Sequence, residues 1–357
     1  MRMQTSDVTY DHGKGDDLLA NDLPSKGAGQ SRWQGIAFAA LLLAAPSFAG
    51  DFWLSVFMMP WLILSLAGIG LNITTGYAGL LSIGAGGFMA VGAYGMYAFA
   101  VHGGIENFLV ILLLGGLATA IVGFLVGIPS TRIGGFYVIV TTLAAQFFLV
   151  WLFGDVPWFY NYSPVPTIAL PPTVQLFGLN LTNDPIVSYY FVVVTVIALT
   201  WVAKNLVESP IGRNWIAVRD MNIAAQVIGI KVNSSKILAF AIGGFYLGIA
   251  GALWAFLFLQ NGSPEGFGLD KSFQVLFLII IGGMGTIRGN FIGAAFVLLL
   301  PIVITAASSW IFGNSEFQGL LSNTDNVIFG ALIVLILIKE PEGFDKLIRN
   351  LSTKIQR

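Results

Sequence analysis

The sequence predicts an all-α integral membrane protein with about ten transmembrane helices and two glycine-rich breaks. Hydrophobic residues make up 56% of the 357 residues and charged residues only 10%, whereas soluble domains carry about 25% charged residues. Residues 52–105 contain no Asp, Glu, Lys or Arg, and one bilayer crossing needs about 20 apolar residues. The 43 glycines suit helices that approach one another closely in lipid.

Ten apolar segments are the predicted spans, and they divide the chain into three parts. Residues 1–32 are polar and are expected to form a disordered cytoplasmic tail. Residues 33–338 form the predicted transmembrane domain, and residues 339–357 a cytoplasmic C-terminal tail. The predicted spans are 33–50, 53–71, 83–101, 108–129, 133–153, 187–203, 237–260, 272–284, 290–311 and 326–338.

Lysine and arginine predict the orientation of these spans, because cytoplasmic loops carry most of the positive charge. With the N-terminus in the cytoplasm and ten alternating crossings, 16 of the 17 basic residues fall on the inner side, and only Lys271 falls outside. Both termini are therefore predicted to be cytoplasmic. The longest periplasmic loop is then 155–186, whose prolines and aromatic residues suit either an interfacial belt or a docking surface for an outer partner.

The longest inner loop, residues 204–236, is predicted to be structured. Its first helix is expected to start at Ser209-Pro210, because Ser is a good N-cap and Pro suits the first helical position. Apolar residues then repeat at helical spacing, at Ile211, Trp215 and Val218.

A second short helix is predicted over residues 221–228 of the same loop. Asp220 is expected to cap its start, and Gly229 to end it in a left-handed conformation. Arg213 and Arg219 accompany the apolar residues of the two helices. The pair would either rest on lipid or contact another protein, where Arg219 would bind lipid phosphates or an acidic residue of that protein.

Two glycine-rich segments, residues 76–87 and 282–289, interrupt the apolar sequence and are called the first and second glycine breaks. Broken helices often line transporter sites near the midplane, and glycines also let helices pack closely. The sequence leaves both interpretations open. The candidate residues of a translocation pathway are Gly76, Tyr77, Gly79, Ser82, Gly282, Gly283 and Gly285.

Several classes of protein chemistry are not indicated. Without cysteine and with two histidines, a metal site is not expected, and no pairing of candidate catalytic residues is visible. A net charge of −1 indicates no nucleic-acid partner. The spans hold almost no ionisable residue of the kind that ion-coupled transporters use, and no phosphate-binding P-loop occurs. The energy for transport would therefore come from another subunit, through loop 204–236.

Residues 209–231 resemble the coupling segment of bacterial ABC importer permeases, most closely that of the branched-chain amino acid (Liv-type) permease family. Ile223-Ala224-Ala225 and Gly229 match the Glu-Ala-Ala…Gly pattern of importers, with Ile in place of Glu.

Two further segments, residues 70–82 and 282–293, resemble other signatures of this family, and their spacing suits its LivM-like half. The resemblance covers residues 50–345. In one departure, many members have Gly-His-Ala after the Leu-Ser of the first signature, where this chain has Gly84-Ala85-Gly86. If that histidine touches substrate in relatives, the solute here differs.

The resemblance implies a permease subunit that moves branched-chain or similar amino acids across the bacterial inner membrane and is not itself an enzyme. The partners it implies are a second Liv-type permease subunit, two cytoplasmic ATPase subunits that hold ATP and Mg, and a periplasmic substrate-binding protein. The chain itself is expected to contact membrane lipid and to need no cofactor. The residues it assigns to ATPase coupling are Arg213, Arg219, Asp220, Ala224, Ala225 and Gly229.

Two alternatives stay open at this point. The first is a permease of the same family for urea, short amides or another small organic solute. The second is a stand-alone ion-coupled secondary transporter. Co-purification distinguishes the two classes, because only a permease of the family would bring ATPase subunits with it. The sequence does not decide whether the second permease is a different chain or a second copy.

Overall fold

The computed structural model describes residues 53–133, 137–176, 178, 181 and 184–312, with the single positions 42 and 344. The predicted spans 33–50 and 326–338 and both predicted tails otherwise lie outside the described residues. The chain divides into two units, Met1–Phe48 and Ala49–Arg357, and every element named below belongs to the second. Within the described residues, all of the regular elements are helices.

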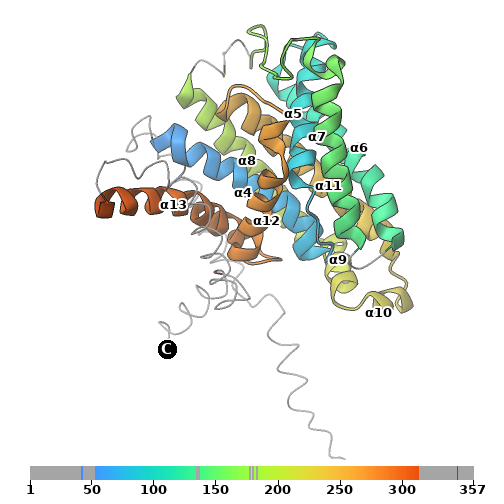
Figure 1. Ribbon diagram of the computed structural model, residues 1–357. Helices are drawn as coiled ribbons and strands as arrows, with labels where there is room; N and C mark the ends of the chain where they lie inside the picture. The colour runs from blue at the N-terminus through green and yellow to red at the C-terminus, as the bar shows by residue number, and fades with distance from the viewer. Residues whose placement is uncertain are drawn as a thin grey trace, which may run out of the picture. The chain divides into compact units, whose positions relative to one another are not determined.

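Long helices occupy the predicted spans of the described part. Each of the eight predicted spans from 53–71 to 290–311 contains one such helix (Figure 1). They are α4 (Met59–Asn72), α5 (Ala85–Val101), α6 (Phe108–Ile133), α7 (Tyr137–Asp155), α8 (Pro185–Glu208), α11 (Val232–Leu253), α12 (Leu269–Gly282) and α13 (Ile287–Phe312).

Shorter helical elements connect or extend the long ones. Two of them, α9 (Pro210–Asp220) and α10 (Asn222–Val227), lie between α8 and α11. The π turns are η2 (Leu54–Met58), η3 (Ile73–Tyr77) and η5 (Trp254–Phe258), and the 3-10 turns are η4 (Pro157–Tyr160) and η6 (Glu265–Phe267).

The membrane class follows from the length and hydropathy of these helices. In the described part, five continuous helical segments are long and apolar enough to cross a membrane: Leu54–Tyr77, Phe108–Thr131, Tyr137–Asp155, Pro185–Glu208 and Val232–Phe258. The all-α membrane class is thereby confirmed. The count of ten stays a prediction, because two of the predicted spans lie outside the described residues.

Two of these segments form the interior of the unit. In the most apolar window of Leu54–Tyr77 and of Val232–Phe258, 72% of the residues are buried, against 28–33% in α6, α7 and α8. Glycine allows close helix crossings: a Cβ on Gly92 of α5 would overlap the backbone of Gly248 in α11. Small residues at such crossings let backbones approach in lipid.

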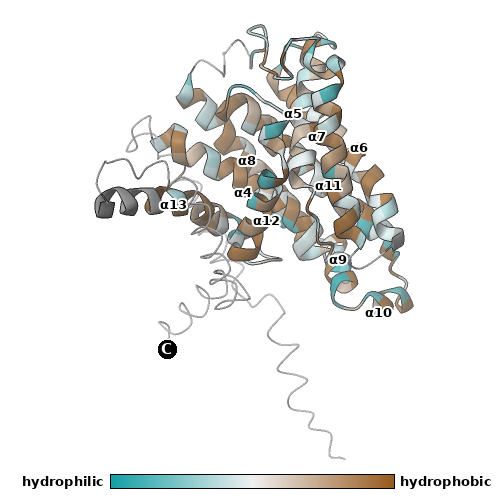
Figure 2. Cartoon of the chain, viewed as in Figure 1, coloured by the Kyte–Doolittle hydropathy of each residue, from teal (hydrophilic) through white to brown (hydrophobic). Residues whose placement is uncertain are grey.

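Helices α6, α7 and α8 carry large apolar side chains on their outer faces, and their hydropathy is high along the length of the helices (Figure 2). Apolar surface of this extent suits contact with lipid tails rather than water. Examples are Leu117, Ile121, Leu125, Phe147, Trp151, Val194 and Trp201.

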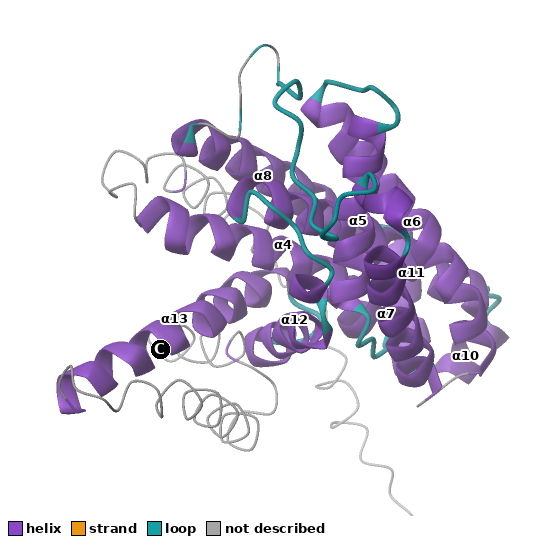
Figure 3. Cartoon of the chain, turned by 45° about the horizontal axis from the view of Figure 1, so that its top comes forward, coloured by secondary structure: helices purple, strands orange, loops and turns teal. Residues whose placement is uncertain are grey.

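Helix α5 begins inside the bundle rather than at its edge. Residues 78–84, between η3 and α5, are not helical (Figure 3), as predicted for the first glycine break. The first backbone N–H groups of a helix need partners outside it. The N–H of Gly86 donates to Ser272 Oγ at 2.8 Å, and the N–H of Gly87 donates to Gln146 Oε1. Gln146 is the middle residue of α7.

Helix α12, like α5, begins beside the middle of α7. The Gln146 amide donates to the carbonyl oxygen of Phe267, two residues before α12, at 2.8 Å. Ser272, in the first turn of α12, donates to Gln146 Oε1 at 2.9 Å. Because α12 starts at Leu269, Lys271 lies in its first turn within the bundle. The predicted span 272–284 began after Lys271, so this helix starts slightly earlier than the sequence indicated.

Candidate functional site

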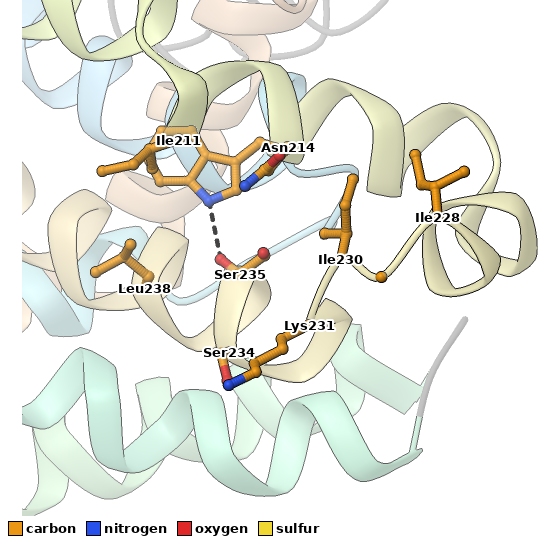
Figure 4. Close-up of a pocket in the computed structure, with 10 residues that line it drawn as sticks. Ile211, Asn214, Ile228, Ile230, Lys231, Ser234, Ser235 and Leu238 are labelled. Atoms are coloured by element: carbon orange, nitrogen blue, oxygen red, sulfur yellow. Dashed lines mark hydrogen bonds between the residues drawn. The ribbon is translucent and has the colours of Figure 1, made fainter.

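The site begins with α9, which is held on the bundle by its apolar face. As predicted, Ser209 caps it: its hydroxyl accepts the N–H of Ile211 at 3.2 Å. Trp215 is fully buried, and its indole N–H donates to the Ser235 carbonyl in α11 at 2.8 Å (Figure 4). Ile211, expected on the same face, is instead 37% exposed. α9 is thus anchored to α11 by one tryptophan.

Helix α10 follows α9 with a different cap from the one predicted. Its N-cap is Met221, without a side-chain hydrogen bond. Asp220, expected to cap it, ends α9 and accepts from Arg219 Nε at 2.8 Å. Gly229 does adopt the predicted left-handed conformation, with φ of 90°. The Asp220 carboxylate therefore pairs with Arg219 and does not cap α10.

The two alanines of the coupling signature differ in environment. Ala225 is 2% exposed and packs against Val218 of α9 and Val232 of α11. Ala224 is exposed. Ala225 therefore stabilises residues 204–236, which form the inner segment of the predicted topology. Of the two alanines, only Ala224 is free to contact a partner.

An apolar surface covers the outside of α10, and we call it the α10 patch. Its four residues are 70–82% exposed, which is unusual for large apolar side chains on one short helix. A shallow groove lies beside the patch, between α9, the α10–α11 loop and the start of α11; Ile228, Ile230 and Lys231 are among its lining residues (Figure 4). The α10 patch consists of Met221, Ile223, Val227 and Ile228.

Arg219 connects α9 to the first glycine break. Its Nη1 donates to the carbonyl oxygen of Gly76 at 2.9 Å, across 143 residues of sequence, and its Nε donates to Asp220. The sequence suggested partners outside the chain for Arg219, whereas these two partners lie within it. Arg213, on the same helix, is exposed.

Both glycine breaks surround the Arg219 side chain. Gly79 has φ of 69°, and a Cβ there would lie 2.7 Å from Arg219 Cγ. Gly285 has φ of 78°, and a Cβ there would lie 3.2 Å from Arg219 Nη1. A left-handed backbone and this close approach both favour glycine. The coupling segment and the two breaks therefore meet at one place.

Asn72 joins the two breaks directly. Its amide donates to the Thr286 carbonyl at 3.0 Å and to Asn290 Oδ1 at 3.1 Å, while its Oδ1 accepts the N–H of Gly285 at 2.8 Å. A Cβ on Gly76 would overlap Asn72 Oδ1. Asn72 and Asn290 are fully buried, and buried amides need such partners. We call Arg219, Gly76, Gly79, Gly285 and Asn72 the glycine junction.

The other candidate pathway residues are packed rather than exposed. Tyr77 and Ser82 are buried, and the Ser82 hydroxyl accepts the Gly84 N–H at 3.4 Å. Gly282 ends α12, where a Cβ would overlap the backbone of Gly289, and Gly283 follows with φ of 118°. In the isolated chain, the close-packing interpretation of the breaks therefore describes these positions better.

Sequence reasoning missed the buried amides that organise the site. Asn72 and Asn290 lie inside the two quoted signatures, and Gln146 lies inside a predicted span. The available signal was simple: a polar side chain inside an apolar span needs a buried partner. Among the described residues, no group of three or more His, Cys, Asp or Glu residues gathers as a metal site.

Comparison with known proteins gives matches to transport permeases. A family model described as branched-chain amino acid transport system, permease component, matches residues 54–337. The high-affinity branched-chain amino acid transport system permease proteins LivM of Salmonella typhimurium and Escherichia coli are each 28% identical to this chain. Those alignments cover 79% of this chain and 67% of each relative.

Shorter matches extend beyond these two relatives. The autoinducer 2 import system permease protein LsrC of an Enterobacter strain is 29% identical over 136 residues, which cover 37% of this chain and 38% of that protein. No solved structure gives a significant match.

The apolar helices and the family match define a multi-pass membrane permease. The chain belongs to the family of branched-chain amino acid transport permease components, and it is LivM-like. It is thus the permease component of an ABC-type transport system in the inner membrane, and its relatives are transporter subunits rather than enzymes.

Proposed function

We propose that this chain is the permease subunit of an ABC importer for branched-chain or similar amino acids in a bacterial inner membrane, with both termini in the cytoplasm. The observation that carries the proposal is the exposed α10 patch, which directly follows helix α9, where Arg219 bonds to Gly76. The two LivM relatives, whose names specify branched-chain amino acid transport, support the choice of solute.

The α10 patch is the proposed contact for an ATPase subunit. A short helix with apolar residues on its outer side suits a groove on a partner protein. Ile223 and Val227 lie one helical turn apart and are 81% and 82% exposed, so both side chains enter the same groove. ATP and Mg bind on two such ATPase subunits, and this chain holds no cofactor.

The glycine junction is the proposed path by which ATPase movement reaches the membrane. α9 is anchored to α11 through Trp215 and to the first break through Arg219. A displacement of α10 therefore acts on α9 and on both breaks together. ATP-bound ATPase subunits shift the permease between outward- and inward-open states only if they bind one of these states more tightly. The contact at the α10 patch supplies this difference in affinity.

Two further partners complete the proposed importer. A second Liv-type permease subunit forms the other half of the pathway, and a periplasmic substrate-binding protein delivers the solute to the outer side, where loop 155–186 lies in the proposed topology.

Reconstitution tests the proposal. The chain is co-expressed with candidate second-permease, ATPase and binding-protein subunits, purified with an affinity tag on this chain, and placed in liposomes. We expect ATPase subunits to co-purify, and leucine uptake to require both ATP and loaded binding protein. Purification of a transport-active chain without ATPase subunits would instead establish a secondary transporter.

Ala85 favours a second class of solute, namely urea, short amides or another small organic molecule. Ala85 stands where many family members carry histidine, and it is fully buried at the start of α5. If that position contacts solute, a permease for urea, short amides or another small organic solute fits. Competition of each of these solutes against leucine in the same liposomes decides between the two.

A further inference from the structure

Lys271 is a cation inside the apolar bundle. It lies in the first turn of α12, next to Ser272, which bonds to the middle residue of α7. It is also the one basic residue that the predicted topology places away from the inner side. A charged side chain within a membrane bundle is costly, and such residues face the bundle interior or a water-filled cavity and meet a partner there.

The partners of Lys271 within the described residues carry no negative charge. Its Nζ lies 3.8 Å from the centroid of the Trp254 ring and donates to Gln274 Oε1 at 2.8 Å. In the described part of the chain, the ion pair is Arg219–Asp220, and no carboxylate lies within ion-pair distance of Lys271. An ammonium group has three N–H donors. Gln274 and the Trp254 ring face occupy two of them, so one N–H of Lys271 can bind another acceptor.

The surroundings hold this ammonium in place. Trp254 is nearly fully buried and belongs to the π turn η5, and π turns within helices are frequent at functional sites. A cation over a tryptophan face is attracted by the ring quadrupole. Lys271 itself is partly exposed.

We propose that Lys271, positioned by Trp254 and Gln274, binds the carboxylate of the transported solute. This proposal rests on the proposed import function and narrows its solute class. A carboxylate supplies the missing negative charge and accepts a charge-assisted hydrogen bond. Urea and short amides carry no such charge, so the site favours amino acids over these solutes.

The absence of native cysteine allows a direct test. The whole chain contains no cysteine, so Lys271→Cys in the liposome complex carries the one thiol of this subunit. We expect leucine uptake at saturating loaded binding protein to fall about tenfold or more, as for loss of a charged hydrogen bond. Treatment with 2-aminoethyl methanethiosulfonate rebuilds a side chain ending in an ammonium and is expected to restore uptake.

Reagents of other charge serve as comparisons. Methyl methanethiosulfonate, which adds no charge, and the anionic 2-sulfonatoethyl reagent are expected to label Lys271→Cys without restoring uptake. Prior addition of loaded binding protein is expected to slow labelling, because the solute covers the thiol. Asp270→Asn, at the exposed neighbouring carboxylate, changes a charge in the same turn and is expected to leave uptake near that of the native complex.

Assembly is measured separately from transport. Lys271→Arg and Lys271→Met are compared for the amount of assembled complex and for uptake, and the arginine variant is expected to transport better. The proposal is overturned if Lys271→Cys transports like the native complex, if none of the reagents labels it, or if restoring the ammonium restores nothing. In each of those cases, leucine uptake by the native complex still supports the proposed function, whereas absence of that uptake rejects the function itself.

Discussion

The Nη1 of Arg219 donates a hydrogen bond of 2.9 Å to the carbonyl oxygen of Gly76. Arg219 closes α9 on the inner side of the proposed topology, and Gly76 lies in η3 at the first glycine break. This bond therefore joins the segment proposed to contact the ATPase to the segment where the membrane helix is interrupted.

Removing the Arg219 side chain should uncouple hydrolysis from transport. Arg219→Met keeps an unbranched apolar stem but loses the donors to Gly76 and Asp220. We expect the complex to assemble and hydrolyse ATP, while uptake falls about tenfold, since a hydrogen bond from a charged donor contributes about 1.5–3 kcal/mol. Arg219→Lys keeps the charge and should be intermediate. Parallel loss of hydrolysis and uptake in Arg219→Met would contradict a linking role.

A charge in the α10 patch should prevent binding of the ATPase subunit. Val227→Asp is not expected to destabilise the chain, because the side chain is 82% exposed. In a groove, an unpaired carboxylate costs several kcal/mol, so affinity for the ATPase subunit should fall by about 100-fold. Pull-down of the ATPase with tagged permease measures this loss.

Gln226→Glu provides the matched control for the α10 patch. Gln226 is exposed on the same helix but is polar, so an added carboxylate there should leave binding near that of the native chain. Equal binding by Val227→Asp and Gln226→Glu would show that the patch does not contact the ATPase.

Substitution by Glu should destabilise the chain at Ala225 but not at Ala224. Ala225→Glu buries a charge against Val218 and Val232, which should destabilise the inner segment by about 3 kcal/mol or more. Ala224→Glu places the same carboxylate on an exposed position and should leave the segment folded. Limited proteolysis of residues 204–236 in purified protein compares the two. Equal protease resistance of both variants would refute the burial of Ala225.

A side chain at Gly79 should disturb the glycine junction. Gly79→Ala adds a Cβ 2.7 Å from Arg219 Cγ on a left-handed backbone, so Arg219 must move away from Gly76 and uptake should fall strongly. Gly104→Ala is the control, since Gly104 also has a left-handed backbone, with φ of 62°, but has open space around it. Each variant carries a backbone strain of about 1 kcal/mol, so a larger loss of uptake at Gly79 reports the contact with Arg219.

Thiol labelling in intact cells tests the predicted topology. Cysteines at Ser163 and Asn261, which are both exposed, should react with an impermeant reagent added outside. The neighbouring Gly262 is unsuitable for labelling, because it is buried and pairs with the Ile168 backbone. A cysteine at Asn222 of α10 should react only after the membrane is opened. Reaction at position 222 in intact cells would place the α10 patch outside and reject the coupling role.

The sequence by itself determined the features that depend on local pattern. Hydropathy located the helices of the described part, and Ser209 and Gly229 marked the start of α9 and the end of α10. These signals are local because a cap or a left-handed glycine involves only residues within a turn of it. The family signatures were likewise visible as short motifs in the correct order.

Only the tertiary structure decided which of these motifs meet. Asp220 looked like a cap but pairs with Arg219, and Ala225 looked like a partner contact but packs inside the segment. Arg219 and Gly76 are 143 residues apart, and no periodicity relates them. Their contact depends on how α9 packs on the bundle and where the backbone of η3 frees a carbonyl, and both follow from long-range packing that a linear pattern does not encode.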